Sequence, residues 1–175
     1  AKILVYDRNG ILLDETRIKP KWSKYNQISE LDVSHYWSWI NASLEKFSDL
    51  FKVKDTIITT HGCTFALIKN GVLAIPILDY ENEPPEEIKN QFEKIQPSFK
   101  ETLTPRLPMG LNYAVHIFWR QKMHPSIIEN CDAILPYPQY WVWKLTGHLA
   151  SEISYLGCHS YLWSPIKNEP SSLSK

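Results

Sequence analysis

The clearest periodicity of apolar positions lies between residues 32 and 51. Its apolar side chains recur at spacings of three and four residues and are those of Trp37, Ile40, Leu44, Phe47 and Phe51. This spacing places them on one face of a helix. Asp32 or Ser34 is expected to cap its first turn, since both residue types accept hydrogen bonds from free backbone N–H groups.

Shorter apolar stretches predict five strands. They are residues 3–6, 11–18, 56–60, 65–68 and 72–77. Asn-Gly pairs at residues 9–10 and 70–71 favour tight turns, so the first two and the last two strands are expected to form hairpins. Residues 56–60 are rich in β-branched side chains and are expected to be buried, whereas the polar residues 19–29 predict a loop.

Four further helices are expected downstream. They begin near Pro84, Gly110, Pro125 and Pro138, and the last is closed by Gly147 as its C-terminal cap. Hairpins followed by alternating helices and strands predict an α/β domain with a mixed sheet flanked by helices.

The composition of the chain argues against several classes of function. The chain has 175 residues and a mass of 20.4 kDa, the size of one well-cored domain. Its 19 basic residues balance its 19 acidic residues, which argues against a general nucleic-acid partner. No apolar run approaches the ~20 residues that span a bilayer, so no membrane partner is expected. Three widely spaced cysteines, Cys63, Cys131 and Cys158, favour reduced thiols and a cytoplasmic location.

Nucleotide-binding glycine motifs and metal-ligand spacings are absent from the sequence. His61 and Gly62 stand out because they directly follow a predicted strand, and ligands bind beyond the carboxyl ends of strands in open α/β sheets. Asp79, Tyr80 and Glu81 follow another strand end. The structural alternatives are a buried, hydrogen-bonded turn histidine at His61 and an ordinary solvated loop at residues 79–81.

Two other candidates have structural alternatives as well. Trp119 offers either core packing or a flat wall for the apolar face of a sugar. Glu152 follows Gly147 and could face the same cleft, although spacing alone does not show it.

Several segments, taken in order, resemble the N-terminal domain of the FGGY family of carbohydrate kinases. They are the opening hairpin 3–10, Thr59-Thr60-His61-Gly62, Ile75-Pro76-Ile77-Leu78-Asp79-Tyr80-Glu81, Leu107-Pro108 through Phe118-Trp119-Arg120, Tyr140-Trp-Val-Trp-Lys-Leu-Thr-Gly147 and Ser151-Glu152-Ile153-Ser154. Their shared order and spacing carry the resemblance, which covers nearly the whole chain.

The resemblance implies a ribonuclease-H-like fold of the actin and hexokinase type, in which sugar and ATP meet between two domains. It implies a sugar site made of His61, Gly62, Asp79, Tyr80, Glu81, Trp119 and Glu152. It also implies a phosphate contact at Lys2, the one matching residue of the family's Asp-x-Gly-x-Thr-x-x-Arg/Lys motif. The Arg of the family's Trp-x-Asp-x-Arg pattern is missing, since Glu81 is followed by Asn82, so the identity of the sugar stays open.

The expected function is therefore the sugar-binding half of an ATP-dependent carbohydrate kinase. Residues 1–175 are expected to be an N-terminal domain truncated at both ends. By the resemblance, the Asp of the phosphate motif precedes Ala1 and the general-base Asp follows Lys175. The chain alone is expected to be inactive and to bind no ATP or Mg²⁺, which the complete kinase would use.

Its expected partners are a small-molecule sugar, the missing C-terminal kinase domain and a second copy in a homodimer. The alternatives are a non-catalytic sugar-binding or regulatory homologue and a plain packing module.

Overall fold

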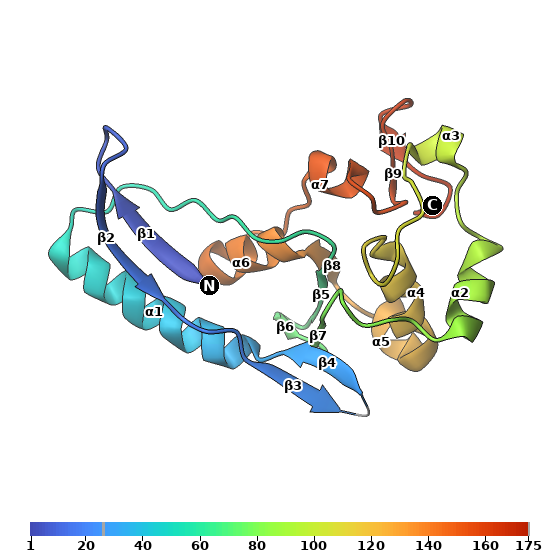
Figure 1. The fold of residues 1–175 in the computed structure, drawn as a ribbon, viewed down its shortest axis with the longest axis horizontal. Coiled ribbons are helices and arrows are strands. Elements are labelled where there is room, and N and C mark those ends of the chain that lie inside the picture. The colour runs from blue at the N-terminus through green and yellow to red at the C-terminus, as the bar shows by residue number, and fades with distance from the viewer. Residues whose placement is uncertain (26, 175) are drawn as a thin grey trace.

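Hairpins at one end of the molecule are joined to a group of short helices at the other end by a central group of strands and a helix (Figure 1). The structure is a computed structural model, and it describes residues 1–25 and 27–174. Within those residues the strands form four small antiparallel sheets. The α/β class is confirmed. The described strands form separate antiparallel sheets in place of the expected mixed sheet, and some of them lie at other positions than expected.

The opening hairpin is confirmed. Strand β1 (Lys2–Tyr6) pairs antiparallel with β2 (Leu12–Arg17). The carboxylate of Asp7 closes the turn by accepting the N–H groups of Asn9 at 2.8 Å and Ile11 at 2.9 Å. Gly10 has a φ of 80°, a conformation that glycine adopts without strain.

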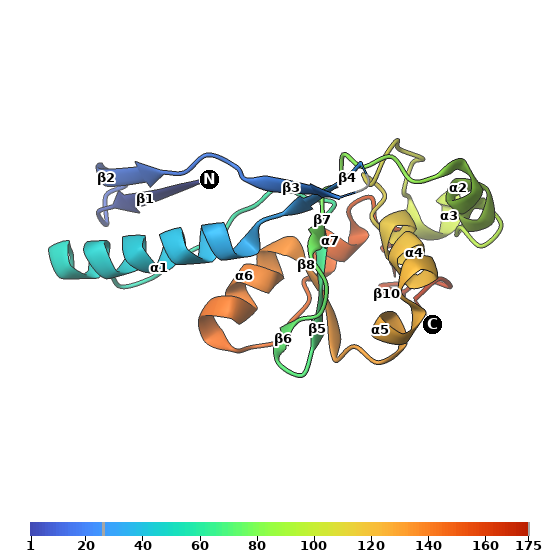
Figure 2. The same cartoon turned by 90° about the horizontal axis from the view of Figure 1, so that it is seen from below.

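Helix α1 (Val33–Leu50) begins at Asp32, one of the two expected caps. The Asp32 carboxylate accepts the N–H of His35 at 3.0 Å, which satisfies one of the free donors of the first turn. The helix lies beneath the layer of hairpins and buries Tyr36 and Phe47 on its inner face (Figure 2).

Residues 56–60 are not the buried strand that their β-branched side chains predict. They carry no regular structure, and the side chain of Ile57 is 92% exposed. Strand propensity is realised only when a neighbouring strand takes up the backbone hydrogen bonds. Among the described residues no strand pairs with this segment, which crosses the molecule as an extended connection (Figure 1).

The expected loop over residues 19–29 is instead a hairpin. Strands β3 (Trp22–Tyr25) and β4 (Ile28–Leu31) pair antiparallel, and β4 also pairs with β7 (Ile77–Leu78). Residue 26 lies outside the described residues. Polar residues such as Lys19, Ser23 and Lys24 interrupt the apolar positions of this segment, so its sequence does not show a clear strand pattern.

The second expected hairpin is confirmed around Asn70 and Gly71, both with positive φ. Strand β5 (Phe65–Lys69) pairs with β6 (Val72–Leu73) and with β8 (Ala133–Pro136). The expected strand 72–77 is divided, because β6 ends at Leu73 and β7 joins a different sheet.

The remaining elements form the other end of the molecule and the centre. They are α2 (Glu86–Glu93), α3 (Phe99–Thr102), α4 (Ala114–Met123), α5 (Pro125–Glu129), α6 (Tyr137–Thr146), α7 (Ile153–Gly157), β9 (Trp163–Ser164) and β10 (Glu169–Pro170). Helix α6 ends at Gly147, whose φ of 76° confirms the expected cap. The sequence pattern predicts a helix that begins near Gly110, and α4 begins four residues later, at Ala114.

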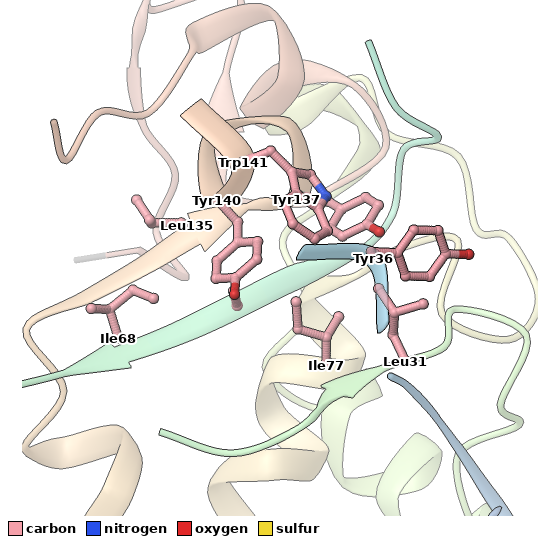
Figure 3. Packing of buried hydrophobic residues seen from close by; sticks show 9 residues of the cluster. Leu31, Tyr36, Ile68, Ile77, Leu135, Tyr137, Tyr140 and Trp141 are labelled. Atoms are coloured by element: carbon pink, nitrogen blue, oxygen red, sulfur yellow. The ribbon is translucent and has the colours of Figure 1, made fainter. Parts of the chain in front are cut away.

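The main core is rich in aromatic side chains and joins six elements, α1, α6, β4, β5, β7 and β8. Its buried residues are Leu31, Tyr36, Ala66, Ile68, Ile77, Leu135, Tyr137, Tyr140 and Trp141. In Figure 3 the side chains of α6 point toward those of β5, β7 and α1. This core fixes Tyr137 at the first turn of α6, directly beside the candidate site.

Candidate functional site

His61 lies at the centre of a small aromatic cluster just before β5. Its imidazole packs against the rings of Tyr80 and Tyr137, with centroid separations of 5.3 Å and 4.7 Å. The Nε2 atom lies 3.2 Å from the hydroxyl oxygen of Thr64. Three separate parts of the chain therefore meet around one imidazole, although the residue His61 itself is exposed to solvent.

The imidazole of His61 is held in its neutral form at pH 7. Partial burial of the ring lowers the pKa of His61, and the negative charge of Asp79 opposes this shift only in part. A neutral imidazole offers one N–H donor and one nitrogen acceptor. His61 can therefore both donate to and accept from a hydroxyl group.

Asp79, Tyr80 and Glu81 form a tight turn directly after β7. The Asp79 carboxylate accepts the N–H of Glu81 at 3.1 Å. Asp79 is 8% exposed, while Glu81 is open to solvent. Burial raises the pKa of the Tyr80 phenol, and the charge of Glu81 raises it further, so this phenol remains a hydrogen-bond donor at neutral pH.

Asn82 closes this turn and ties it to the neighbouring hairpin. Its side-chain amide donates to the carbonyl oxygens of Asp79 at 2.7 Å and Ser29 at 2.8 Å. Its amide oxygen accepts the N–H of Ser29 at 2.8 Å. A buried amide with these three bonds holds the turn in one conformation.

Helix α4 holds the same turn from the other side. The Nε2 atom of His116 lies 2.9 Å from the carbonyl oxygen of Asn82, and His116 is 1% exposed. Because a carbonyl oxygen only accepts, Nε2 carries the proton of this neutral imidazole. The N–H of Gly110 donates to the carbonyl oxygen of Tyr80 at 2.8 Å. The backbone of residues 80–82 is thus fixed by partners on both sides.

His116 is expected to make stability depend on pH. Burial lowers the pKa of His116 to about 4, the charge of Arg120 adds to this, and the hydrogen bond to Asn82 opposes it. The unfolded imidazole titrates near 6.5, so between these values only the unfolded chain takes up the proton. The free energy of unfolding should therefore fall as pH drops from about 6.5 to about 4, by up to about 3 kcal/mol.

Urea unfolding at several pH values across this window measures the effect. His116→Gln, which keeps a donor for Asn82 and removes the titration, should show the shallower slope. Equal slopes in the two proteins would show that His116 is not the responsible group.

Glu152 is the N-terminal cap of α7. Its carboxylate accepts the N–H groups of Ser154 and Tyr155, each at 2.9 Å. Tyr155 in turn joins α7 to the site, because its hydroxyl accepts the N–H of Thr64 at 3.2 Å and donates to the Thr64 carbonyl at 3.1 Å. The structure therefore brings Glu152 into the same hydrogen-bonded network as His61, with its carboxylate already engaged.

The other expected site residues are placed differently. Trp119 is 7% exposed and packs edge-on against His116 at 5.7 Å, so little of its ring is open to a ligand. Gly62 lies in an exposed turn with open space beside its Cα. Lys2 is exposed at the start of β1, in the opening hairpin. A sugar contact at Trp119 and a phosphate contact at Lys2 stay predictions.

The sequence did not point to Tyr137, Thr64, Asn82 or Tyr155 as site residues. Tyr137 precedes Pro138, where a helix is expected to begin. The sequence therefore indicated that Tyr137 lies at a helix start, but not which residues it contacts. The others depend on contacts between distant segments, such as the 53 residues that separate Ser29 from Asn82.

Among residues 1–25 and 27–174, no group of three or more His, Cys, Asp or Glu side chains is placed to hold a metal ion. No helix in this same part of the chain is long and apolar enough to cross a membrane.

Comparison with known proteins places the fold. No family model and no curated protein sequence matches the chain. Solved structures do match. A carbohydrate kinase from Novosphingobium aromaticivorans has 33% sequence identity and a TM-score of 0.93, over 99% of this chain.

More distant structures share the fold. Xylulose kinase from Lactobacillus acidophilus has 13% identity and a TM-score of 0.75, over 98% of this chain. Glycerol kinase from Plasmodium falciparum, solved with ADP, has 14% identity and the same TM-score, also over 98%. The chain spans 36–37% of the length of these three proteins. Its fold is therefore that of the FGGY-type carbohydrate kinases, over a share of their length consistent with the N-terminal domain.

Proposed function

We propose that this chain is the sugar-binding half of an ATP-dependent carbohydrate kinase. The observation that carries the proposal is the meeting of His61, Asp79 and Tyr80 at one corner of a carbohydrate-kinase fold. These side chains come from two segments that the sequence pattern singled out separately.

The corner suits a sugar chemically. A neutral imidazole and a protonated phenol supply donors and acceptors for hydroxyl groups. The Asp79 carboxylate, with one hydrogen bond from Glu81 already made, accepts further bonds from hydroxyls, and charged acceptors make the stronger bonds. The rings of Tyr80 and Tyr137 give apolar area next to these polar atoms.

The site is built to position a ligand. The turn 79–82 is held by Ser29, Gly110 and His116, and such rigid placement is the main protein contribution to phosphoryl transfer. In the complete protein the bound sugar hydroxyl would attack the γ-phosphate of ATP after losing its proton to a general base.

The base, the C-terminal domain and the ATP and Mg²⁺ sites belong to the complete protein in this proposal. The described residues provide no ligand set that would hold Mg²⁺ by themselves. In the same proposal, residues 1–175 alone bind sugar without transferring phosphate. A cytoplasmic location and a homodimer also belong to the proposal, the first because Cys63, Cys131 and Cys158 are free thiols.

The proposal predicts saturable sugar binding that depends on His61. Isothermal titration of the chain with a panel that includes xylulose, gluconate and glycerol should reveal at least one ligand. His61→Ala should weaken that ligand roughly tenfold or more, because it removes a hydrogen-bonding group from the site.

His148→Ala is the matched control. His148 is an exposed histidine after α6, and its replacement should leave affinity unchanged. Equal binding by wild type and His61→Ala would remove His61 from the site, and an absence of binding across a broad panel would favour the plain packing module.

A further inference from the structure

Thr64 directly precedes β5, and two helices fix its position beside the candidate site. Its carbonyl oxygen accepts the N–H of Tyr137, the first residue of α6, at 3.0 Å. The hydroxyl of Tyr155, in α7, donates to the same oxygen at 3.1 Å and accepts the Thr64 N–H at 3.2 Å. Both polar groups of the Thr64 backbone are thus bonded, and the residue is 3% exposed.

The side chain of Thr64 meets that of His61 across a tight turn. Between them, Cys63 has a φ of 64°, a conformation that non-glycine residues adopt mainly in turns. The hydroxyl oxygen of Thr64 lies 3.2 Å from Nε2 of His61. The rings of Tyr80 and Tyr137 pack against the same imidazole. The imidazole is therefore held by two aromatic rings and by one hydrogen bond.

The direction of this hydrogen bond follows from the proton of the Thr64 hydroxyl. A buried hydroxyl proton without an acceptor loses its hydration and gains nothing in return. Within residues 1–25 and 27–174, the Thr64 hydroxyl makes no hydrogen bond other than the one to His61. A proton on Nε2 would leave that hydroxyl proton without an acceptor. Nε2 is therefore the acceptor, and the proton of the neutral imidazole lies on Nδ1.

We propose that Thr64 is a positioning residue, whose hydroxyl donates to Nε2 of His61 and so fixes the proton of the imidazole on Nδ1. Nδ1 makes no hydrogen bond within the part of the chain that the structure describes, and His61 is exposed. The ligand then meets His61 as a donor, and the ligand atom opposite it is an acceptor, such as the oxygen of a sugar hydroxyl or carbonyl group. Asp79 has the opposite role, because an ionised carboxylate only accepts.

Heteronuclear NMR of the chain with ring-labelled histidine tests this tautomer in the absence of sugar. Proton–nitrogen correlations at mildly alkaline pH distinguish a proton on Nδ1 from one on Nε2, and His61→Ala identifies the signals of His61. Wild type should carry the proton on Nδ1. Thr64→Val keeps the shape of the side chain without its hydroxyl and should lose this preference, because nothing then donates to Nε2. Thr64→Ser restores the hydroxyl and should keep the preference.

Thr59→Val is the matched control. The exposed side chain of Thr59 makes no hydrogen bond among the described residues, so its replacement should leave the tautomer of His61 as in wild type. A proton on Nε2 in wild type would overturn the proposal, and this result needs no variant to fold. A proton that stays on Nδ1 in Thr64→Val would overturn it as well.

The consequence for the ligand rests on the proposed function and is measured separately. A sugar that binds wild type should bind Thr64→Val about three- to tenfold more weakly, the effect of one misdirected hydrogen bond, and should bind Thr64→Ser about as well as wild type. Unchanged affinity in a Thr64→Val chain with an altered tautomer would overturn the role of Thr64 in ligand binding. Failure of wild type to bind any sugar would instead count against the proposed function, and the tautomer measurement would still stand.

Discussion

Replacing Gly110 with alanine is expected to destabilise the protein by about 2–4 kcal/mol. A Cβ atom at this position would lie 2.7 Å from Nε2 of His116 and closer still to the Cε1 and Nδ1 atoms of the same ring. His116 cannot move away easily, because it is buried and bonded to Asn82. The strain would also displace the Gly110 N–H from the Tyr80 carbonyl.

Urea unfolding of Gly110→Ala measures this cost. Gly62→Ala is the matched control, since a Cβ there meets no atom within 4 Å, and its stability should stay within about 0.5 kcal/mol of wild type. Wild-type stability in Gly110→Ala would show that the loop before α4 is looser than the structure has it.

Arg120→Met is expected to cost about 3–5 kcal/mol of unfolding free energy. The Arg120 guanidinium lies 2.6 Å from the Glu30 carboxylate and donates to the Pro76 carbonyl at 3.1 Å. The side chains of Arg120 and Glu30 are 4% and 17% exposed. Removing the cation leaves a carboxylate largely shielded from water without its partner, and separates α4 from β4 and the segment before β7.

Thermal and urea unfolding check this prediction. The double variant Arg120→Met with Glu30→Gln should recover part of the loss, because no unpaired charge remains. Arg17→Met serves as the control. The side chains of Arg17 and Glu15 are 68% and 38% exposed, so their ion pair should contribute less than about 1 kcal/mol to the free energy of unfolding. A cost in Arg120→Met as small as that of Arg17→Met would contradict the account.

Local signals predicted those parts of the fold that local chemistry determines. Asp32 caps α1, Gly147 ends α6, and Asn70-Gly71 turns between β5 and β6, as expected. Each of these features needs only a side chain and its own neighbouring backbone.

The secondary-structure prediction failed where the formation of a strand depends on a partner strand far along the chain. Residues 56–60 have strand propensity and lack a paired strand among the described residues, whereas residues 22–25, which fall in the expected loop, pair with β4. Pairing of this kind depends on segments far along the chain, which propensity does not report.

The candidate site shows the same difference between local features, which the sequence predicts, and long-range contacts, which it does not. Expected strand ends pointed to His61 and Asp79. Residues 56–60 form no strand before His61, whereas β7 does end directly before Asp79, and Tyr80 of the following turn packs against the His61 imidazole. Asn82, Tyr137 and Tyr155 were missed because their roles arise from contacts across 53, 76 and 91 residues.

The function proposed for residues 1–175 is that of the sugar-binding half of a carbohydrate kinase. Its most direct test is ADP release from ATP by the native protein, captured from cells with an antibody to this chain and offered the sugar panel. The account predicts ADP release that depends on one sugar, from a protein well above 20.4 kDa on a denaturing gel. A native protein that binds sugar and releases no ADP would contradict it and favour the non-catalytic sugar-binding or regulatory homologue.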